Sequence, residues 1–155
     1  MYKITIIAVG KIKDAYWKDA ENEYLKRLQQ YAKMEIIELK EEAFTSTNER
    51  AAIQKKEAAL IEKHIPQGAR VIALSEDGKT YDSIAFAQTL DQLGQRGDHI
   101  VFIIGGPLGV FPELKKRDLS ISLSQLTFPH QMVRPMLAEQ IYRACTILKK
   151  KQYHY

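Results

Sequence analysis

The stretch LSISLSQLTFPHQMVRPMLAEQIYRACTILKKKQYHY, residues 119–155, holds most of the chemically distinctive side chains of this 155-residue chain. Its pattern predicts a short strand, a polar turn closed by Phe128-Pro129-His130, a long amphipathic helix and a basic tail with aromatic residues. One further glycine turn lies just upstream. The rest of the chain has the character of a scaffold for these features.

The predicted helix carries one apolar stripe that other apolar side chains widen beyond a single face. The stripe consists of Val133, Leu137, Ile141, Ala144 and Leu148. A helix with such a surface can pack on its own sheet and on a second copy of the chain. We expect Pro135 to lie in or near the first turn, because an interior proline costs about 3 kcal/mol.

Upstream of this stretch, predicted strands and helices alternate without a repeat, linker or low-complexity segment. Short β-branched runs predict strands at 4–9, 34–39, 71–74 and 100–104, and periodic segments predict helices at about 14–31, 48–65 and 83–93. The pattern predicts one α/β domain over residues 1–155, with a mainly parallel sheet flanked by helices. The aromatic stripe of Trp17, Tyr24 and Tyr31 suits core packing better than base stacking.

Composition excludes several classes of protein. The hydrophobic share of 45% and charged share of 27% are typical of globular domains, and a net charge of +4 is too small to indicate nucleic-acid binding by itself. Cys145 is the lone cysteine, which excludes an internal disulfide and a cysteine-rich zinc site and fits a reducing cytoplasm. We expect no signal peptide, membrane span, metal site or serine-type catalytic triad.

Ligands of parallel α/β sheets bind beyond the carboxyl ends of the strands, where Leu74, Gly105 and the turn after Leu123 are expected. The sequence GGPLG lacks the spacing of a dinucleotide or phosphate-binding loop. Gly105 and Gly106 either admit a ligand to the backbone or form a tight turn, and both interpretations stay open. The turn at 123–128 suits an adenine ring, although an ordinary connection has the same composition.

The tail after the helix mixes three lysines with aromatic and imidazole side chains. Lysines at this position also interact favourably with the helix dipole. Their interleaving with Tyr153 and His154, and the presence of Arg134 and Arg143 on the same helix, favour RNA contact.

Taken together, these motifs resemble the RlmH family of small SPOUT-class methyltransferases. The resemblance covers the whole chain and rests on IIAVGKIKDAYW, FIIGGPLG, SLSQLTFPHQMVRPMLAEQIYRA and the terminal Tyr-His. It implies S-adenosyl-L-methionine as cofactor and methylation of N3 of a pseudouridine in the 23S ribosomal RNA of the large subunit, on the assembled ribosome. It also implies a C-terminal trefoil knot, a cytoplasmic homodimer, and a tail that completes the site of the other subunit.

The resemblance, the charge pattern of the tail and the chemistry of methyl transfer together predict roles for individual residues. The cofactor residues are expected to be Leu74, Gly105, Gly106, Leu123, Ser124, Gln125, Leu126, Thr127 and Phe128. The expected RNA contacts are Arg134, Lys149, Lys150, Lys151 and His130, of which His130 is also expected to shape the loop. In catalysis, His154 is expected to assist proton removal, Arg143 to stabilise the anionic base or bind phosphate, and Tyr153 to stack on or orient the base.

Three positions depart from the family pattern. Gln152 stands where a proline commonly precedes Tyr-His, Tyr155 follows where a basic residue is common, and Pro135 replaces an aliphatic residue. These departures keep open a ribosome-binding or RNA-binding module that lacks turnover. A third interpretation, a nucleotide-binding protein unrelated to RNA, fits the glycine turn but leaves the tail unexplained.

Overall fold

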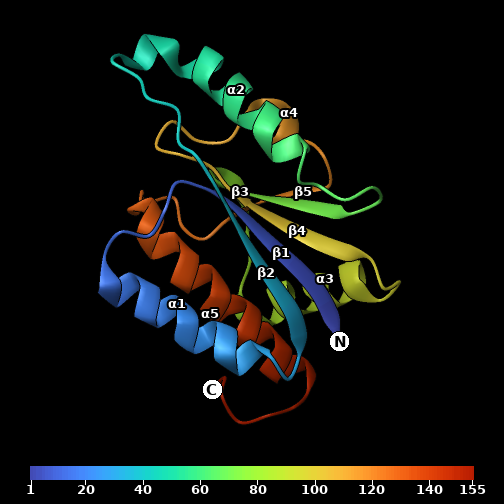
Figure 1. Ribbon diagram of the computed structural model, residues 1–155. Helices are drawn as coiled ribbons and strands as arrows, with labels where there is room; N and C mark the ends of the chain where they lie inside the picture. The colour runs from blue at the N-terminus through green and yellow to red at the C-terminus, as the bar shows by residue number, and fades with distance from the viewer.

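The apolar runs pair into a single five-stranded parallel sheet, whose order is β2-β1-β4-β3-β5 in the computed structural model of residues 1–155 (Figure 1). The strands are β1 (Tyr2–Val9), β2 (Ala32–Leu39), β3 (Arg70–Thr80), β4 (His99–Ile104) and β5 (Leu119–Ser122). All four neighbouring pairs are parallel. The sequence therefore predicted the class and the direction of the sheet correctly.

Helices cover both faces of the sheet. The helices α1 (Ala15–Leu28), α3 (Ser83–Gly94) and α5 (His130–Leu148) pack on one face, while α2 (Arg50–Glu62) and the short α4 (Pro112–Lys115) pack on the other. Figure 1 shows α1 and α5 side by side and α2 on the far side of the strands. No helix combines the length and the apolar character that crossing a membrane requires.

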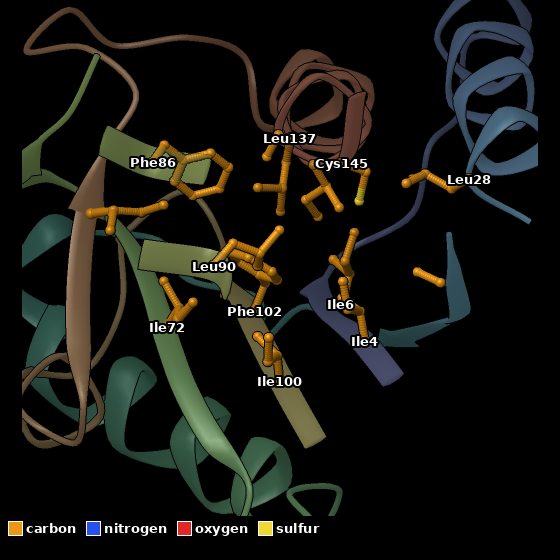
Figure 2. Close-up of a cluster of buried hydrophobic side chains, with 14 of the residues drawn as sticks. Ile4, Ile6, Leu28, Ile72, Phe86, Leu90, Ile100, Phe102, Leu137 and Cys145 are labelled. Carbon is orange, nitrogen blue, oxygen red and sulfur yellow. The ribbon is translucent and has the colours of Figure 1, made fainter. Parts of the chain in front are cut away.

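The central strands β1 and β4 are apolar on both faces because both faces are buried. Ile4 and Ile6 point into the core formed with α1, α3 and α5, whereas Ile7 and Val9 point into the core beneath α2. Figure 2 shows the first core, in which Phe102 of β4 lies close to Leu90 of α3 and Leu137 of α5. Because both faces of these strands are buried, their sequences are continuous apolar, β-branched runs without alternating polar residues. Such runs therefore predicted the strands correctly.

Two elements differ from the prediction. β3 continues to Thr80, so the segment expected as a turn after Leu74 belongs to the strand. The pairing of β3 with β5 is interrupted between Leu74 and Lys79, and Gly78 packs so closely on β5 that a Cβ there would lie 2.5 Å from the carbonyl carbon of Ile121. Pairing with β5 keeps the part of β3 after Leu74 extended, although it contains a glycine. The short helix α4 was not predicted.

Pro135 was expected in or near the first turn of α5; it is the sixth residue of the helix, just beyond the first turn and inside the helix. Because proline has no amide N–H, the carbonyl of Gln131 loses its i+4 donor at this point. Tertiary packing overrides this local cost, since Pro135 is buried.

Arg134 was expected to contact RNA, and that expectation is wrong. The side chain is 1% exposed, and its Nε and Nη2 donate to the two oxygens of Glu21 at 2.7 and 2.9 Å. Its Nη1 donates to Glu38 at the end of β2. Because all three contacts lie between α5, α1 and the sheet, the guanidinium is used inside the fold and does not reach a phosphate.

We predict that Arg134→Met lowers the free energy of unfolding by about 3 kcal/mol, because it leaves the buried Glu21 carboxylate without its main partner. Urea unfolding followed by circular dichroism measures the change.

The matched control is Arg27→Met, which breaks an i,i+4 pair between Arg27 and Glu23 whose side chains are 42% and 51% exposed. This control is expected to change stability by less than about 0.5 kcal/mol. Equal effects of the two substitutions would contradict a special role for Arg134.

Candidate active site

The larger of two candidate cavities has a volume of about 730 Å³ and lies at the carboxyl ends of β3, β4 and β5. Leu74 ends the regular part of β3, Gly105 follows β4, and Leu123 follows β5, so the three segments meet at one edge of the sheet. Residues of α2 and the start of α5 complete the wall. The volume lies in the range typical of small-molecule sites.

The turn after β4 is held by close backbone contacts. The Gly109 N–H donates to the Gly106 carbonyl at 2.9 Å, and Gly109 has a φ of +86°. A Cβ at Gly105 would lie 2.8 Å from the carbonyl carbon of Gly109, so no larger residue fits without a backbone shift. Of the two interpretations of the glycine pair, the tight turn is therefore real, and it also forms a wall of the cavity.

Nearly all of the residues predicted to hold the cofactor line this cavity. They are Leu74, Gly105, Gly106, Leu123, Ser124, Leu126, Thr127 and Phe128. Gln125 is exposed and is absent from the wall. The loop is held by its own hydrogen bonds: the Ser122 hydroxyl donates to the Ser124 carbonyl at 2.8 Å, and Ser124 Oγ accepts from the Leu126 N–H at 3.0 Å.

Sequence reasoning missed the contribution of α2. Arg50 Nη1 and Gln54 Nε2 both donate to the Leu108 carbonyl, at 2.8 and 2.7 Å, and both side chains line the cavity. Their i,i+4 spacing on one helix face was the available signal. His130 also lies in the wall, beside Gly10. Its contact with RNA stays a prediction.

The three residues predicted to act in catalysis come together at the other end of α5. Arg143 Nη1 lies 3.3 Å from His154 Nδ1, and its guanidinium carbon lies 4.7 Å from the centre of the Tyr153 ring. Glu139 accepts from Arg143 Nε at 3.0 Å and from the Tyr153 hydroxyl at 3.1 Å. Together with Glu139, these residues form what we call the tail cluster.

The tail cluster has a defined protonation pattern. Hydrogen bonding by Glu139 raises the pKa of Arg143, so the guanidinium stays cationic. Burial, followed by the hydrogen bonds to Tyr24 and Glu139, raises the pKa of Tyr153, so its phenol stays neutral. Because a guanidinium can only donate, a hydrogen bond between these two groups requires Nδ1 of His154 to accept.

The tail cluster and the cavity lie far apart in one chain. His130, at the first position of α5, lines the cavity, whereas Arg143 lies thirteen residues further along the same helix, roughly 20 Å at 1.5 Å per residue. In Figure 1 the C-terminal tail lies at the end of α5 that faces away from α2. Lys149, Lys150 and Lys151 are exposed there.

A second cavity of about 430 Å³ connects these two regions along α1, α3 and α5. Its wall includes the aromatic residues Trp17 and Tyr24, with Pro135 and Met136 of α5 opposite. Trp17 and Tyr24 were expected in the core, but they are only half-buried and form the wall of this apolar groove. Leu123 lines both cavities, so the groove reaches the loop at 123–128.

No group of three or more His, Cys, Asp or Glu side chains is arranged to hold a metal ion. Arg143, His154 and Tyr153 instead supply a cation, an imidazole and an aromatic phenol, which are suited to an anionic aromatic substrate.

Comparison with known proteins gives consistent results over the whole chain. A relative from Caldicellulosiruptor saccharolyticus, named ribosomal RNA large subunit methyltransferase H, is 45% identical over 152 residues, which is 97% of this chain and 99% of the relative. Relatives of the same name from Bifidobacterium adolescentis and Acetivibrio thermocellus are 46% and 42% identical, and each match covers 98% of this chain and 99% of the relative.

The family model described as "Predicted SPOUT methyltransferase" matches residues 2–154. These matches confirm the resemblance found in the motifs. The chain belongs to the SPOUT methyltransferase family.

Proposed function

We propose that this chain transfers the methyl group of S-adenosyl-L-methionine to N3 of a pseudouridine in 23S ribosomal RNA of the large subunit, on the assembled ribosome. The observation that carries the proposal is the cavity at the carboxyl edge of the sheet, enclosed by the glycine turn and the 123–128 loop of a SPOUT methyltransferase. The names of the relatives support ribosomal RNA as the substrate.

The residues around the cavity fit this cofactor. Leu74, Leu123 and Phe128 provide apolar surface for an adenine ring, and the surrounding loops expose backbone donors and acceptors. The absence of side chains at Gly105 and Gly106 leaves the backbone of the turn accessible. The bound cofactor supplies an activated sulfonium methyl, so the protein has to position the acceptor and favour its deprotonated form.

The tail cluster is suited to that task. Arg143 carries a positive charge that would stabilise the anion left when the N3 proton departs. Tyr153 offers an aromatic face on which a base can stack. In the arrangement described, the Nε2–H of His154 would donate to an oxygen of the base, whereas removal of the proton by His154 requires the ring to leave Arg143.

We propose a homodimer in which each tail completes the site of the other subunit. The separation of roughly 20 Å along α5 keeps the tail cluster of one chain away from its own cavity. A two-fold axis would bring each tail to the opposite cofactor loop, since such an interface uses the same patch twice. The apolar groove supports this arrangement because it adjoins both regions and leaves aromatic surface uncovered.

A binding module that lacks turnover is the second candidate, favoured by Gln152 and Tyr155 in the tail. Methyl transfer decides between the two. We expect transfer of labelled methyl from S-adenosyl-L-methionine to ribosomes from a strain lacking this protein. Assays on intact ribosomes, isolated subunits and free ribosomal RNA show which substrate is preferred. Absence of methyl transfer to all three would contradict the proposal that the chain is an enzyme.

The same assay tests the tail cluster. We predict that His154→Ala and Arg143→Ala each lower the turnover rate by about 100-fold, because each removes a group that acts on the developing charge. Calorimetry should show unchanged binding of the cofactor. His64→Ala, at an exposed histidine near the end of α2, is the control and should keep full activity. Near-normal turnover of both tail variants would overturn their roles.

We predict that Gly105→Ala lowers affinity for S-adenosyl-L-methionine by at least about 10-fold, because the added Cβ pushes against the Gly109 backbone and moves the wall of the cavity. Isothermal titration calorimetry measures the change. Gly68→Ala is the control: no atom lies within 4 Å of the added Cβ, although φ is +76°, so stability falls while affinity stays the same. Unchanged affinity of the Gly105 variant would contradict the placement of the cofactor.

Mixing two defective chains tests the shared site. A chain with Gly105→Ala keeps its tail, and a chain with His154→Ala keeps its cofactor loop. Random exchange of subunits makes about half of the dimers mixed. Each mixed dimer has one intact composite site out of two, so about a quarter of all sites are intact. We therefore predict recovery of about a quarter of the native activity. Sites built within single chains would show no recovery above the sum of the separate variants.

A further inference from the structure

Glu57 is a buried carboxyl group directly behind the glycine turn. The residue lies on α2 and is 4% exposed. Both of its carboxylate oxygens lie 3.2 Å from the position that a Cβ on Gly106 would take. Gly106 itself lines the cavity, so the carboxylate lies next to a residue of the cavity wall that has no side chain.

No cation neutralises Glu57, unlike the other fully buried carboxylate. Glu21 pairs with Arg134 and Lys18, whereas Glu57 belongs to none of the ion pairs of the chain. Its hydrogen bond is from the Glu42 N–H, at 3.3 Å. The carboxylates of Glu41 and Glu42 lie nearby and, together with burial as the largest cause, raise the pKa of Glu57.

The surrounding elements supply no hidden partner. Arg50, on the same helix, directs Nη1 to the Leu108 carbonyl. His130, at the start of α5, lies against Gly10 beside Glu41. A buried carboxyl group without a cation is costly to ionise, which is why its pKa is raised, and a cationic ligand beside it would favour the charged form. The Glu57 carboxylate behind Gly106, with Glu41 and Glu42 adding negative charge nearby, therefore favours a cationic ligand next to Gly106.

We propose that Glu57 makes the cavity selective for the charge of its ligand: acting through Gly106, its carboxylate favours a sulfonium over the corresponding neutral thioether. This inference rests on the proposed function, because S-adenosylmethionine is a sulfonium and S-adenosylhomocysteine, the product of methyl transfer, is a neutral thioether. Loss of the methyl group removes the charge that Glu57 attracts, so the product binds more weakly than the cofactor. Glu57 is thus a specificity-determining residue that acts without touching the methyl group.

Isothermal titration calorimetry with the full chain tests this inference. Glu57→Gln keeps the shape of the side chain but removes its charge. We expect affinity for S-adenosylmethionine to fall by about 10-fold, the order of magnitude for two charges several ångströms apart near a protein surface. Affinity for S-adenosylhomocysteine should change by less than about twofold. A merely structural role would shift both affinities equally, and that result would overturn the inference, as would no shift in either.

Glu62→Gln is the matched control on the same helix, since Glu62 pairs with Arg117 at the surface. It should leave both affinities unchanged. If Glu57→Gln fails to fold, the native chain still tests the idea with sinefungin, which carries an amine cation where the sulfonium stands. Sinefungin should then bind more tightly than S-adenosylhomocysteine, and weaker binding would overturn the inference.

The outcomes separate this inference from the proposed function. If the native chain binds neither cofactor nor product, the assignment of the cavity falls and the inference falls with it. If both ligands bind and Glu57→Gln shifts them equally, only the inference about Glu57 falls. Methyl transfer to ribosomes plays no part in these measurements.

Discussion

The buried ion pair between Arg134 and Glu21 is the constraint on which the arrangement of the site depends. Both side chains are 1% exposed, so the charges satisfy each other only if α5 and α1 keep one relative position. The link to Glu38 extends this constraint to the end of β2. Gln131 reinforces it, since its Oε1 accepts the Lys13 N–H at 2.7 Å. The start of α5, and with it the preceding loop, is therefore tied to the carboxyl edge of the sheet.

The opposite wall of the cavity depends on α2 in a comparable way. Arg50 and Gln54 hold the Leu108 carbonyl, and Glu57 lies directly behind Gly106. The glycine turn has no side chains where α2 contacts it, so contacts with neighbouring residues hold its conformation. A helix on one face of the sheet and a helix on the other thus shape one cavity between them, which explains why residues distant in sequence serve a single site.

The length of α5 separates the cavity from the tail cluster. A continuous helix is rigid, so the loop at its beginning and the tail cluster at its end keep a separation of roughly 20 Å. Glu139 and Tyr142 hold Arg143 and Tyr153 at the far end, beside the apolar groove. A chain built in this way presents the 123–128 loop at one end of the helix and the tail cluster at the other. That separation is the physical basis on which we propose a site shared between two copies.

The sequence by itself determined the alternating architecture, the strands β1 and β4 and the loops of the cavity, because these features depend on local periodicity and on glycine next to buried strands. Tertiary structure decided what the charged residues of helices do. In the helical pattern, Arg134 and Glu57 have the character of polar surface residues, yet both are buried. The partner of Arg134 lies 113 residues away in the sequence, and the neighbour of Glu57 is a glycine in the turn after β4. Pairing with β5 likewise decided the course of β3 beyond Leu74. Contacts between distant segments leave no local pattern, so only the folded chain reveals them.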